Sequence, residues 1–238
     1  MLTQIKLGDI AVDVILKDIK NVHLSVHPPT GRIRISAPRR LSLESIRIFA
    51  VSKLGWIKQQ QKKLLDQERE APREYLERES HYVWGRRYLL KLVEAPAPPN
   101  VELKHNKMIL SVRSGAHEAA KKMVLARWYR EQIKAALPAL IAKWEPLVGV
   151  KVQRVFVQEM KTKWGSCNPR TQSIRLNTEL AKKPRECLEY ILIHEMVHVL
   201  EPTHNVRFSA LMDRYMPQWR TRQQELNRFP LSHVEWLY

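Results

Sequence analysis

The sequence has very little cysteine and no long hydrophobic run. Its two cysteines, Cys167 and Cys187, are too few for a framework of disulfide bonds, which is typical of proteins from a reducing compartment. No apolar stretch approaches the roughly 20 residues that a membrane-spanning helix needs. The first twenty residues mix charged and apolar side chains and lack the apolar core of a signal peptide. We therefore expect a cytoplasmic protein that makes no contact with a membrane.

The sequence also lacks a basic tail or a concentrated basic run, although its net charge is +17. Lysine and arginine outnumber acidic residues by 15 to 10 in residues 1–80, by 12 to 5 in residues 81–150 and by 14 to 9 in residues 151–238. This even distribution favours solubility, or a diffuse attraction to polyanions, over a dedicated nucleic-acid groove. The charge therefore allows weak contact with a nucleic acid as a secondary property.

Alternating and helical hydrophobic patterns predict an α+β protein. Residues 22–37, 81–93, 101–112 and 164–177 alternate apolar and polar residues around turn residues, which predicts β-hairpins, and residues 151–160 alternate like a single strand. Helical spacing follows Ser42, a plausible N-cap, and continues in residues 116–146, after Pro184, and in two segments between residues 205 and 229. No internal repeat is visible. We expect a hairpin–helix region at residues 1–78, hairpins at 79–114 and a catalytic domain at 115–238.

The stretch ILIHEMVHVLEPTH, residues 191–204, sets three histidines and a glutamate into an apolar helical run. His194 and His198 are four residues apart, so their rings lie on one face of a helix, where one tetrahedral ion can bind both. Burying Glu195 without a partner would cost several kcal/mol or raise its pKa, and a nearby divalent cation would compensate. The HExxH pattern predicts zinc, with Glu195 as the general base that takes a proton from an activated water.

A zinc site with one open position needs a third protein ligand, and His204 is the candidate. A helix that continued from His198 would carry His204 away from the other two histidines. Pro202 prevents this because it disfavours helical geometry at Glu201 and ends the helix. We expect the chain to turn back after Pro202 and present His204 to the ion from a short non-helical segment.

Several motifs together resemble the YgjP-like metal-dependent peptidases, bacterial proteins of the zincin fold that are similar to the SprT and WLM groups. The motifs are KTKWGSC (161–167), SIRLN (173–177), LEYILIHEMVH (188–198) and the later His204 and Phe208. The upstream ISAPRRLSLESIRIFAVSKLGWIKQQ and VWGRRYLLKL match the N-terminal part of that family, so the resemblance covers nearly the whole chain.

This resemblance implies a zincin-like metallopeptidase core, with His194, His198 and His204 as zinc ligands and Glu195 as the catalytic base. The sequence departs from the metzincins, which share the ligand spacing, because Glu201 stands where they have glycine. No clear Met-turn is visible either, although two methionines lie downstream, Met212 and Met216. The resemblance also places SIRLN at a sheet edge, where main-chain pairing would bind an extended peptide; an ordinary structural strand is the alternative.

The remaining motif residues allow more than one role. Cys167 is a possible but unneeded ligand, and WGSC is more simply read as a segment that packs under the zinc site or shapes a strand. Cys187 is expected to be a small core residue. An oxyanion needs a stabilising group, and the candidates by residue type alone are Lys163, Arg175 and Tyr215, none of which the sequence favours.

The sequence thus predicts a cytoplasmic zinc metallopeptidase that hydrolyses peptide or protein substrates. The alternative is a nucleic-acid-associated module in which protease activity is secondary to DNA or RNA binding, as the SprT-like relatives and the net charge allow. A metal-stabilised scaffold without catalysis is disfavoured, because a structural zinc site has no use for a glutamate that is not a ligand.

Overall fold

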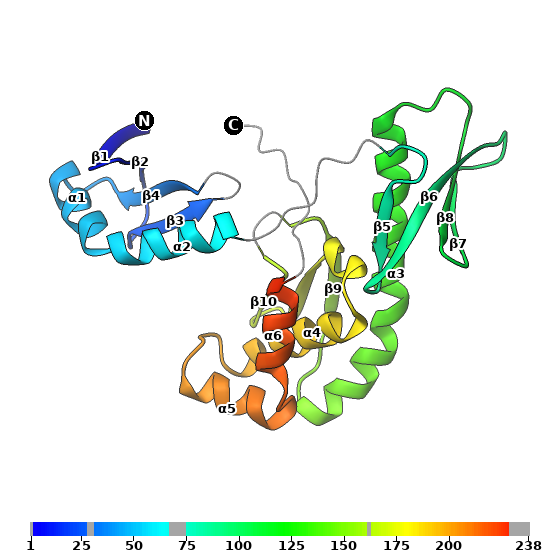
Figure 1. Cartoon of the computed structure of the whole chain (residues 1–238). Helices are drawn as coiled ribbons and strands as arrows, with labels where there is room; N and C mark the ends of the chain where they lie inside the picture. Colours follow the sequence, from blue (N-terminus) through cyan, green and yellow to red (C-terminus); the bar gives the residue numbers. More distant parts are fainter. Residues whose placement is uncertain (1, 28–30, 67–74, 161–162, 229–238) are drawn as a thin grey trace. The chain divides into compact units, whose positions relative to one another are not determined.

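The computed structural model (Figure 1) describes residues 2–27, 31–66, 75–160 and 163–228. The chain divides into two compact units with their boundary between residues 69 and 70, and each unit is described by itself. The predicted hairpin segment 79–114 and the described part of the predicted catalytic segment lie together in the second unit. Helices and sheets both occur throughout, which confirms the α+β class. The division into three functional domains stays a prediction.

The first unit is a four-stranded sheet with two helices. Its elements are β1 (Leu2–Leu7), β2 (Ile10–Lys17), β3 (His23–His27), β4 (Arg32–Pro38), α1 (Leu43–Ser52) and α2 (Leu54–Asp66). The strand order is β1-β2-β4-β3, in which β2 and β4 are parallel and the outer pairs are antiparallel. The predicted hairpin is β3–β4, and Ser42 caps α1 as expected by accepting a hydrogen bond from the Ser45 amide at 3.2 Å.

Alternate apolar residues give this unit its own core. Fully buried valines and isoleucines of β2 and β4 pack with residues of α1 and α2; the members are Val12, Val14, Ile33, Ile35, Ala37, Ile46, Ala50 and Ile57, with Leu7 from β1. On the opposite face of the sheet, the buried carboxylate of Asp13 accepts a hydrogen bond from the guanidinium of Arg32. The β1–β2 hairpin was not anticipated from the sequence.

The second unit begins with a sheet of the same topology. Its strands are β5 (Ser80–Val83), β6 (Arg86–Glu94), β7 (Asn100–Lys104) and β8 (Lys107–Val112), in the order β5-β6-β8-β7 with β6 and β8 parallel. The fold therefore contains a structural repeat that the sequence does not reveal. Each sheet needs only alternating buried residues, such as Val12 and Val14 in β2 and Tyr88 and Leu90 in β6, and no shared motif is required.

The rest of the second unit carries the histidines. It consists of the long helix α3 (Glu118–Val148), the strands β9 (Arg154–Gln158), β10 (Gly165–Asn168) and β11 (Ser173–Asn177), the 3₁₀ helix η1 (Thr178–Lys182), and the helices α4 (Arg185–Leu200), α5 (Val206–Tyr215) and α6 (Trp219–Arg228). Helix α4 is apolar nearly all round because it lies in the core, among α3, α5, α6 and the strands β10 and β11. Its buried residues include Cys187, as expected.

The sheet-edge position that the resemblance implies for the SIRLN strand is wrong, and the alternative, an ordinary structural strand, is what the structure has. The strand order is β10-β11-β9, so β11 lies in the middle of the sheet, paired with β10 on one side and with β9 on the other. The reason is that Gly165–Asn168, which includes the last three residues of WGSC, forms β10 and occupies the position next to β11. Within the described residues, no strand pairs with the other side of β10, so β10 is one of the two edge strands of this sheet and β9 is the other.

A turn of the β5–β6 hairpin fixes the start of α4. The amide of Trp84 donates to the Ala181 carbonyl at 2.8 Å. Gly85 has a φ of +78°, and a Cβ there would lie 3.0 Å from Cγ of Pro184, the residue before α4. A glycine is required at this turn for both reasons. The hairpin sheet thus supports the helix that carries the histidines.

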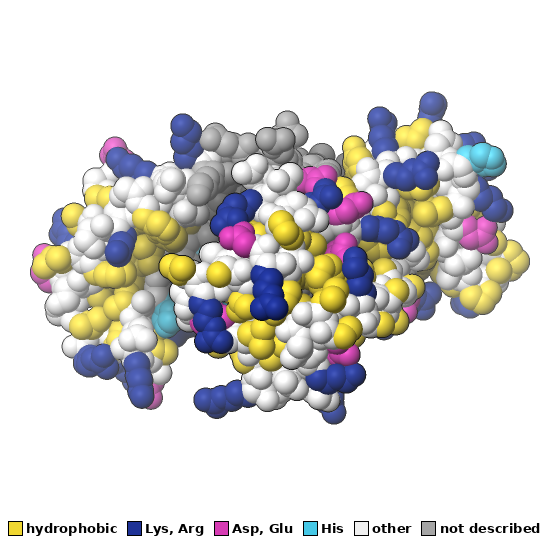
Figure 2. Space-filling view, turned by 90° about the horizontal axis from the view of Figure 1, so that it is seen from below, with side chains coloured by type: hydrophobic (Ala, Val, Ile, Leu, Met, Phe, Trp, Pro, Cys, Tyr) yellow, Lys and Arg dark blue, Asp and Glu magenta, His cyan; other side chains and the backbone are white. Residues whose placement is uncertain are grey.

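The surface agrees with the even charge pattern of the sequence. On the face shown in Figure 2, lysine and arginine side chains are dispersed among hydrophobic and neutral ones and do not form a continuous stripe. Among the described residues, no helix combines the length and the apolar character that crossing a membrane requires.

Candidate metal centre

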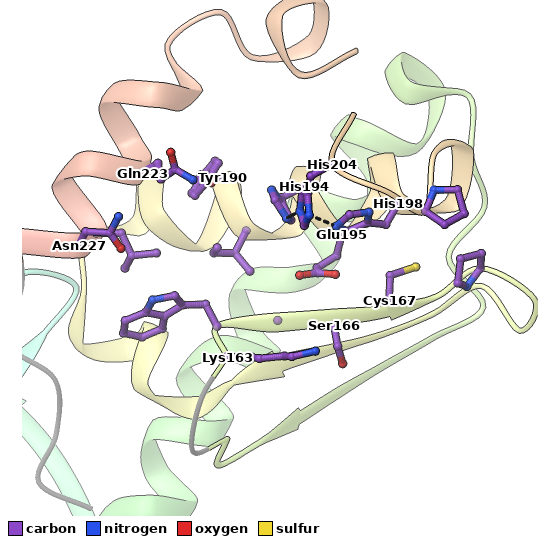
Figure 3. A pocket seen from close by; sticks show the side chains of 16 residues that line it. Lys163, Ser166, Cys167, Tyr190, His194, Glu195, His198, His204, Gln223 and Asn227 are labelled. Atoms are coloured by element: carbon purple, nitrogen blue, oxygen red, sulfur yellow. Dashed lines mark hydrogen bonds between the residues drawn. The ribbon is translucent and has the colours of Figure 1, made fainter. Parts of the chain in front are cut away.

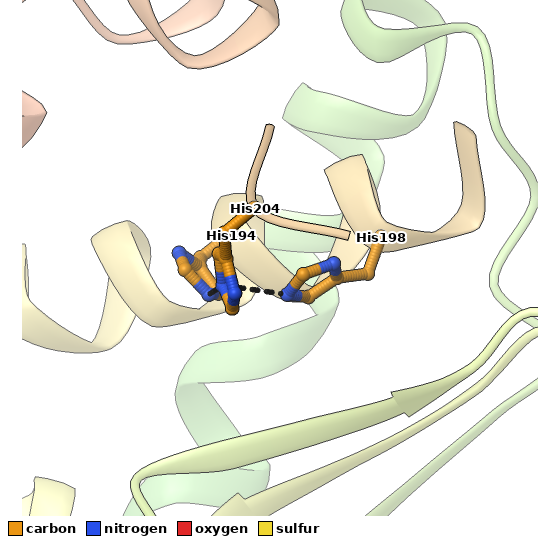
Figure 4. Close-up of side chains that lie close together, drawn as sticks. All are labelled: His194, His198 and His204. Carbon is orange, nitrogen blue, oxygen red and sulfur yellow. Dashed lines mark hydrogen bonds between the residues drawn. The ribbon is translucent and has the colours of Figure 1, made fainter. Parts of the chain in front are cut away.

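Three histidine rings from α4 and the following loop meet at one point (Figure 4). The Nε2 atom of His204 lies 3.0 Å from Nε2 of His194 and 3.1 Å from Nε2 of His198. One nitrogen from each residue falls in a group whose members all lie within 4.8 Å of one another. The structure thus brings together the three residues that the sequence singled out as metal ligands.

The chain returns to the histidines as Pro202 predicts. Helix α4 ends at Leu200, and Glu201 is extended with φ −141° and ψ 100°. The Glu201 carboxylate accepts hydrogen bonds from the amide and hydroxyl of Thr203, the latter at 2.9 Å, and these bonds hold the pKa of Glu201 below its usual range. Asn205 then caps α5 by accepting a bond from the Phe208 amide at 3.0 Å. His204 is therefore fixed between a turn and a helix cap.

Phe208 lies against all three imidazoles. Its ring centroid is 4.9 Å from that of His194 and 4.7 Å from those of His198 and His204. Phe208 is 2% exposed, so the side of the triad that it covers is closed to water. The segment from His204 to Phe208 thus supplies one histidine, the cap that places it and an apolar support for all three rings.

Burial keeps at least two of the imidazoles neutral. It lowers the pKa of His194 to about 3, with further lowering from the nearby His198 and His204. Burial also lowers the pKa of His198, although the Glu201 carbonyl acts in the opposite direction. Nδ1 of His198 lies 3.0 Å from that carbonyl oxygen. A proton on Nδ1 donates to it and leaves Nε2 with a free lone pair, the form in which histidine binds a metal.

The arrangement fits a cation better than it fits hydrogen bonds alone. A proton on Nε2 of His204 can bridge to one of the other two Nε2 atoms but not to both, and Nδ1 of His194 is buried without a hydrogen-bond partner in the described part of the chain. Tetrahedral zinc with Zn–N distances of about 2.0–2.1 Å places its ligand nitrogens about 3.3 Å apart. The observed 3.0 and 3.1 Å are close to that separation.

Glu195 lies beside the triad and is 4% exposed. Burial raises the pKa of its carboxyl to about 8, and the positive charge of Lys163 acts against this rise. Gly165 of β10 passes directly over the carboxylate: a Cβ at residue 165 would lie 2.6 Å from Glu195 Oε1 and 2.9 Å from its Cγ. The glycine of WGSC thus provides space for the carboxylate. The sequence carried no signal for this role, because the contact joins two distant segments.

Asn177 holds the segment that leads into β10. Its amide nitrogen donates to the carbonyls of Met160 and Lys163 at 2.7 and 2.8 Å, and its oxygen accepts from the amide of Glu179 at 3.2 Å. Asn177 is 5% exposed, so these bonds are shielded from water. The last residue of the SIRLN motif therefore positions Lys163 and the start of the WGSC strand.

A cavity of about 610 Å³ contains the site (Figure 3). Its wall comes from the segment around β10, from one face of α4, from the loop after α4 and from α6. The lining residues are Lys163, Trp164, Gly165, Ser166, Cys167, Pro169, Tyr190, Ile191, His194, Glu195, His198, Pro202, His204, Gln223, Leu226 and Asn227. No motif of the sequence pointed to α6 as part of the site.

The structure places some of the other candidate residues at the site and the rest elsewhere. Of the three oxyanion candidates only Lys163 lines the cavity. The hydroxyl of Tyr215 donates to the Val148 carbonyl at 3.3 Å, and the guanidinium of Arg175 lies over the Phe156 ring at 5.7 Å. Cys167 lines the cavity but is not in the histidine group. Burial, followed by the charge of Glu195, raises the pKa of its thiol to about 11.

Three imidazoles beside a buried carboxylate are a set of side chains that metal-dependent hydrolytic sites use. Comparison with known families agrees with that class: the sequence matches the YgjP-like metallopeptidase domain over residues 20–229. The chain therefore belongs to the YgjP-like metallopeptidase family, as its motifs predicted. A comparison with curated protein sequences gives no match.

Two solved structures show partial similarity. They are the metallopeptidase zymogens abylysin from Pyrococcus abyssi and jannalysin from Methanocaldococcus jannaschii, each 19% identical to this chain. Each match covers 37% of this chain, and 90% and 91% of the respective zymogen, with TM-scores of 0.35 and 0.34.

Proposed function

We propose that the protein is a zinc-dependent peptidase in which His194, His198 and His204 hold the ion and Glu195 is the general base. The observation that carries the proposal is the meeting of three imidazole nitrogens beside a buried carboxylate in one cavity. An all-imidazole set of three ligands suits zinc and leaves a fourth position open. We further propose that α3, α4 and the β9–β11 sheet form a zincin-like core.

Zinc bound there would supply Lewis acidity, which lowers the pKa of a coordinated water and polarises the scissile carbonyl. The chain's own residues supply the rest. The ionised Glu195 accepts a proton from the attacking water at a carboxylate oxygen and later returns it to the leaving amine nitrogen, so that water and amide become acid and amine. A divalent charge nearby favours the ionised form of Glu195 and opposes the effect of burial on its pKa.

The substrate backbone is proposed to lie along β10. The far side of β10 is unpaired by any described strand, and three of its residues, Gly165, Ser166 and Cys167, line the cavity. An extended peptide would pair with its main chain at this edge and pass in front of Glu195. Lys163 lines the cavity beside β10, where its ammonium group would stabilise an oxyanion.

The test separates catalysis from metal binding. Glu195→Gln keeps the size of the side chain, but an amide cannot accept the proton of water. We expect wild-type zinc content and a fall in peptide turnover of about 10²–10⁴-fold. His198→Ala and His204→Ala should lose both zinc and turnover. Zinc per chain and hydrolysis of a peptide library are measured side by side.

Three outcomes would contradict the proposal. Wild-type turnover in Glu195→Gln would exclude this carboxylate as the base. Loss of zinc in the same variant, as complete as in His198→Ala, would make Glu195 a ligand. Full zinc retention in His204→Ala would require a different third ligand.

Nucleic-acid binding remains a second proposal, which the net charge of +17 supports. If the attraction is diffuse, affinity for DNA should fall steeply as salt is raised and show little sequence preference. Tight, sequence-selective binding at physiological salt would instead place nucleic-acid recognition ahead of proteolysis.

A further inference from the structure

The cavity extends past the histidines toward α6, and this extension has no part in the proposed hydrolysis. We call it the α6 subpocket; it is lined by Trp164, Tyr190, Ile191, Gln223, Leu226 and Asn227. In Figure 3 the labelled members Tyr190, Gln223 and Asn227 lie on the opposite side of His194 from Cys167. The subpocket therefore lies beside the histidines on the side away from Cys167.

Helix α4 builds the first wall of the subpocket. Tyr190 lies one turn before His194 on the same face, and the two ring centroids are 5.9 Å apart. Tyr190 is 2% exposed, and burial raises the pKa of its hydroxyl to about 12, so the phenol is neutral. Its hydroxyl is hydrogen-bonded to the side chain of Gln223. The α4 wall thus offers an aromatic ring, Ile191 and no charge.

Helix α6 builds the facing wall. Gln223, Leu226 and Asn227 are spaced three and four residues apart, so they share one face of the helix. Leu226 is 2% exposed and packs in the core of the unit. Asp213 of α5 fixes the first residue of α6, because its carboxylate accepts the indole N–H of Trp219 at 2.8 Å. The two amide side chains are therefore held on an anchored helix.

Within the described residues, no acidic or basic side chain lines the subpocket, although the ammonium of the buried Lys183 lies 5.9 Å from the ring centroid of Trp164. Among the described residues that line the whole cavity, Lys163 and Glu195 alone are acidic or basic apart from the histidines, and neither belongs to the α6 subpocket. The charged pair on α6, Arg222 and Glu225, bond to each other at 2.9 Å and do not line the cavity. A charged group that entered as far as the buried side chains of Tyr190, Ile191 and Leu226 would lose hydration, and no lining side chain of the subpocket would supply a counter-charge.

We infer that the α6 subpocket binds a large uncharged side chain of the substrate next to the scissile bond and discriminates against lysine, arginine, aspartate and glutamate at that position. Trp164, Ile191 and Leu226 provide apolar contact for its length. The hydroxyl of Tyr190 and the amides of Gln223 and Asn227 meet its outer end. The inference rests on the proposed function, because it places the subpocket beside the bond to be cut.

The test changes the charge of the subpocket at Asn227. The probes are peptides Ac-Ala-Ala-Xaa-Ala-Ala-amide with Phe, Lys or Glu as Xaa, and their binding is measured on the Glu195→Gln protein, so that no hydrolysis is needed. Each Asn227 substitution is combined with Glu195→Gln. The wild-type subpocket should bind the Phe peptide at least about 10-fold more tightly than either charged one. Asn227→Asp should shift the Lys-to-Glu affinity ratio toward Lys, and Asn227→Lys toward Glu, by about 3- to 10-fold each.

Gln224 provides the matched control. It is the exposed neighbour of Gln223 on α6 and does not line the cavity. Gln224→Asp and Gln224→Lys change the net charge equally and should leave the affinity ratio unchanged. Equal shifts from both positions, unchanged ratios at Asn227, or equal binding of the Phe, Lys and Glu peptides would each overturn the inference. Selective binding without any cleavage by the wild-type protein would leave the inference standing and refute the peptidase function instead.

Discussion

Replacing Gly165 by alanine adds one methyl group to β10 at the point where the strand passes Glu195. The new Cβ would lie 2.6 Å from Oε1 of Glu195, 2.9 Å from its Cγ and 2.9 Å from Cγ2 of Ile191. Carbon atoms in favourable contact are about 3.5–4.0 Å apart. The clash therefore involves two side chains of α4, Glu195 as far back as its Cγ and Ile191, and moving the tip of one flexible side chain does not relieve it.

The size of the effect follows from these distances. Restoring ordinary contact requires a displacement of about 0.6–0.9 Å between β10 and the Glu195 side chain. Overpacking of this kind typically costs about 1–3 kcal/mol of stability. A misplacement of about 1 Å in a reacting group lowers a rate by about 10²-fold. We expect Gly165→Ala to reduce peptide turnover by about 10- to 100-fold while zinc content stays at the wild-type level.

Turnover, zinc per chain and thermal unfolding are measured on the same preparation. Gly55→Ala is the matched control, because a Cβ at Gly55 meets no atom within 4 Å and the residue lies in the helix α2. It should keep full turnover and gain up to about 1 kcal/mol of stability. Unchanged turnover in Gly165→Ala would refute the idea that this close approach positions Glu195. Loss of zinc would show that the displacement reaches the histidines.

Two further predictions concern the surroundings of the site. Asn205→Ala removes the cap of α5 and should cost about 0.5–2 kcal/mol of stability. It should also weaken zinc binding, because His204 directly precedes the cap. Unfolding is compared with and without chelator, and an Asn205→Asp variant that behaves like the alanine variant would contradict the role of the cap. Cys187 is 0% exposed, and burial raises the pKa of its thiol to about 12. Iodoacetamide at pH 8 should therefore leave it unmodified until denaturant is added. Rapid alkylation of Cys187 in the native protein, detected by mass spectrometry, would contradict this burial.

The sequence predicts the elements around the triad well because their signals are local. The turn residues between β5 and β6, the N-cap Ser42 and the helix breaker Pro202 each act within a few residues, and the structure has the expected hairpin, helix start and helix end at those places. The gathering of His194, His198 and His204 is predictable for the same reason, since a single helix, a breaker and a short loop determine it.

Strand order could not be predicted in this way. The apolar–polar alternation in the sequence of Ser173–Asn177 is the same for an edge strand and a central strand, because alternation does not tell which strands lie beside it. Hydrogen bonding to β10 and β9 decides the position, and both of these strands precede β11 in the sequence, so the order of the segments along the chain does not reveal which strand lies in the middle. The parallel pairing of β2 with β4 and of β6 with β8 has the same character, so the repeated sheet topology became visible only in three dimensions.

The ligands of the site depend on local sequence, whereas the walls of the cavity depend on contacts between distant segments. The proposed ligands lie within one segment, residues 194–204, supported by Phe208, and their geometry depends on local structure. The walls of the cavity come from β10, α4 and α6, and they meet only through packing of the second unit. Substitutions on α6 can therefore alter which peptide binds without touching a ligand. Substitutions at Gly165 affect the carboxylate from outside the HExxH segment, where the motif gives no warning of them.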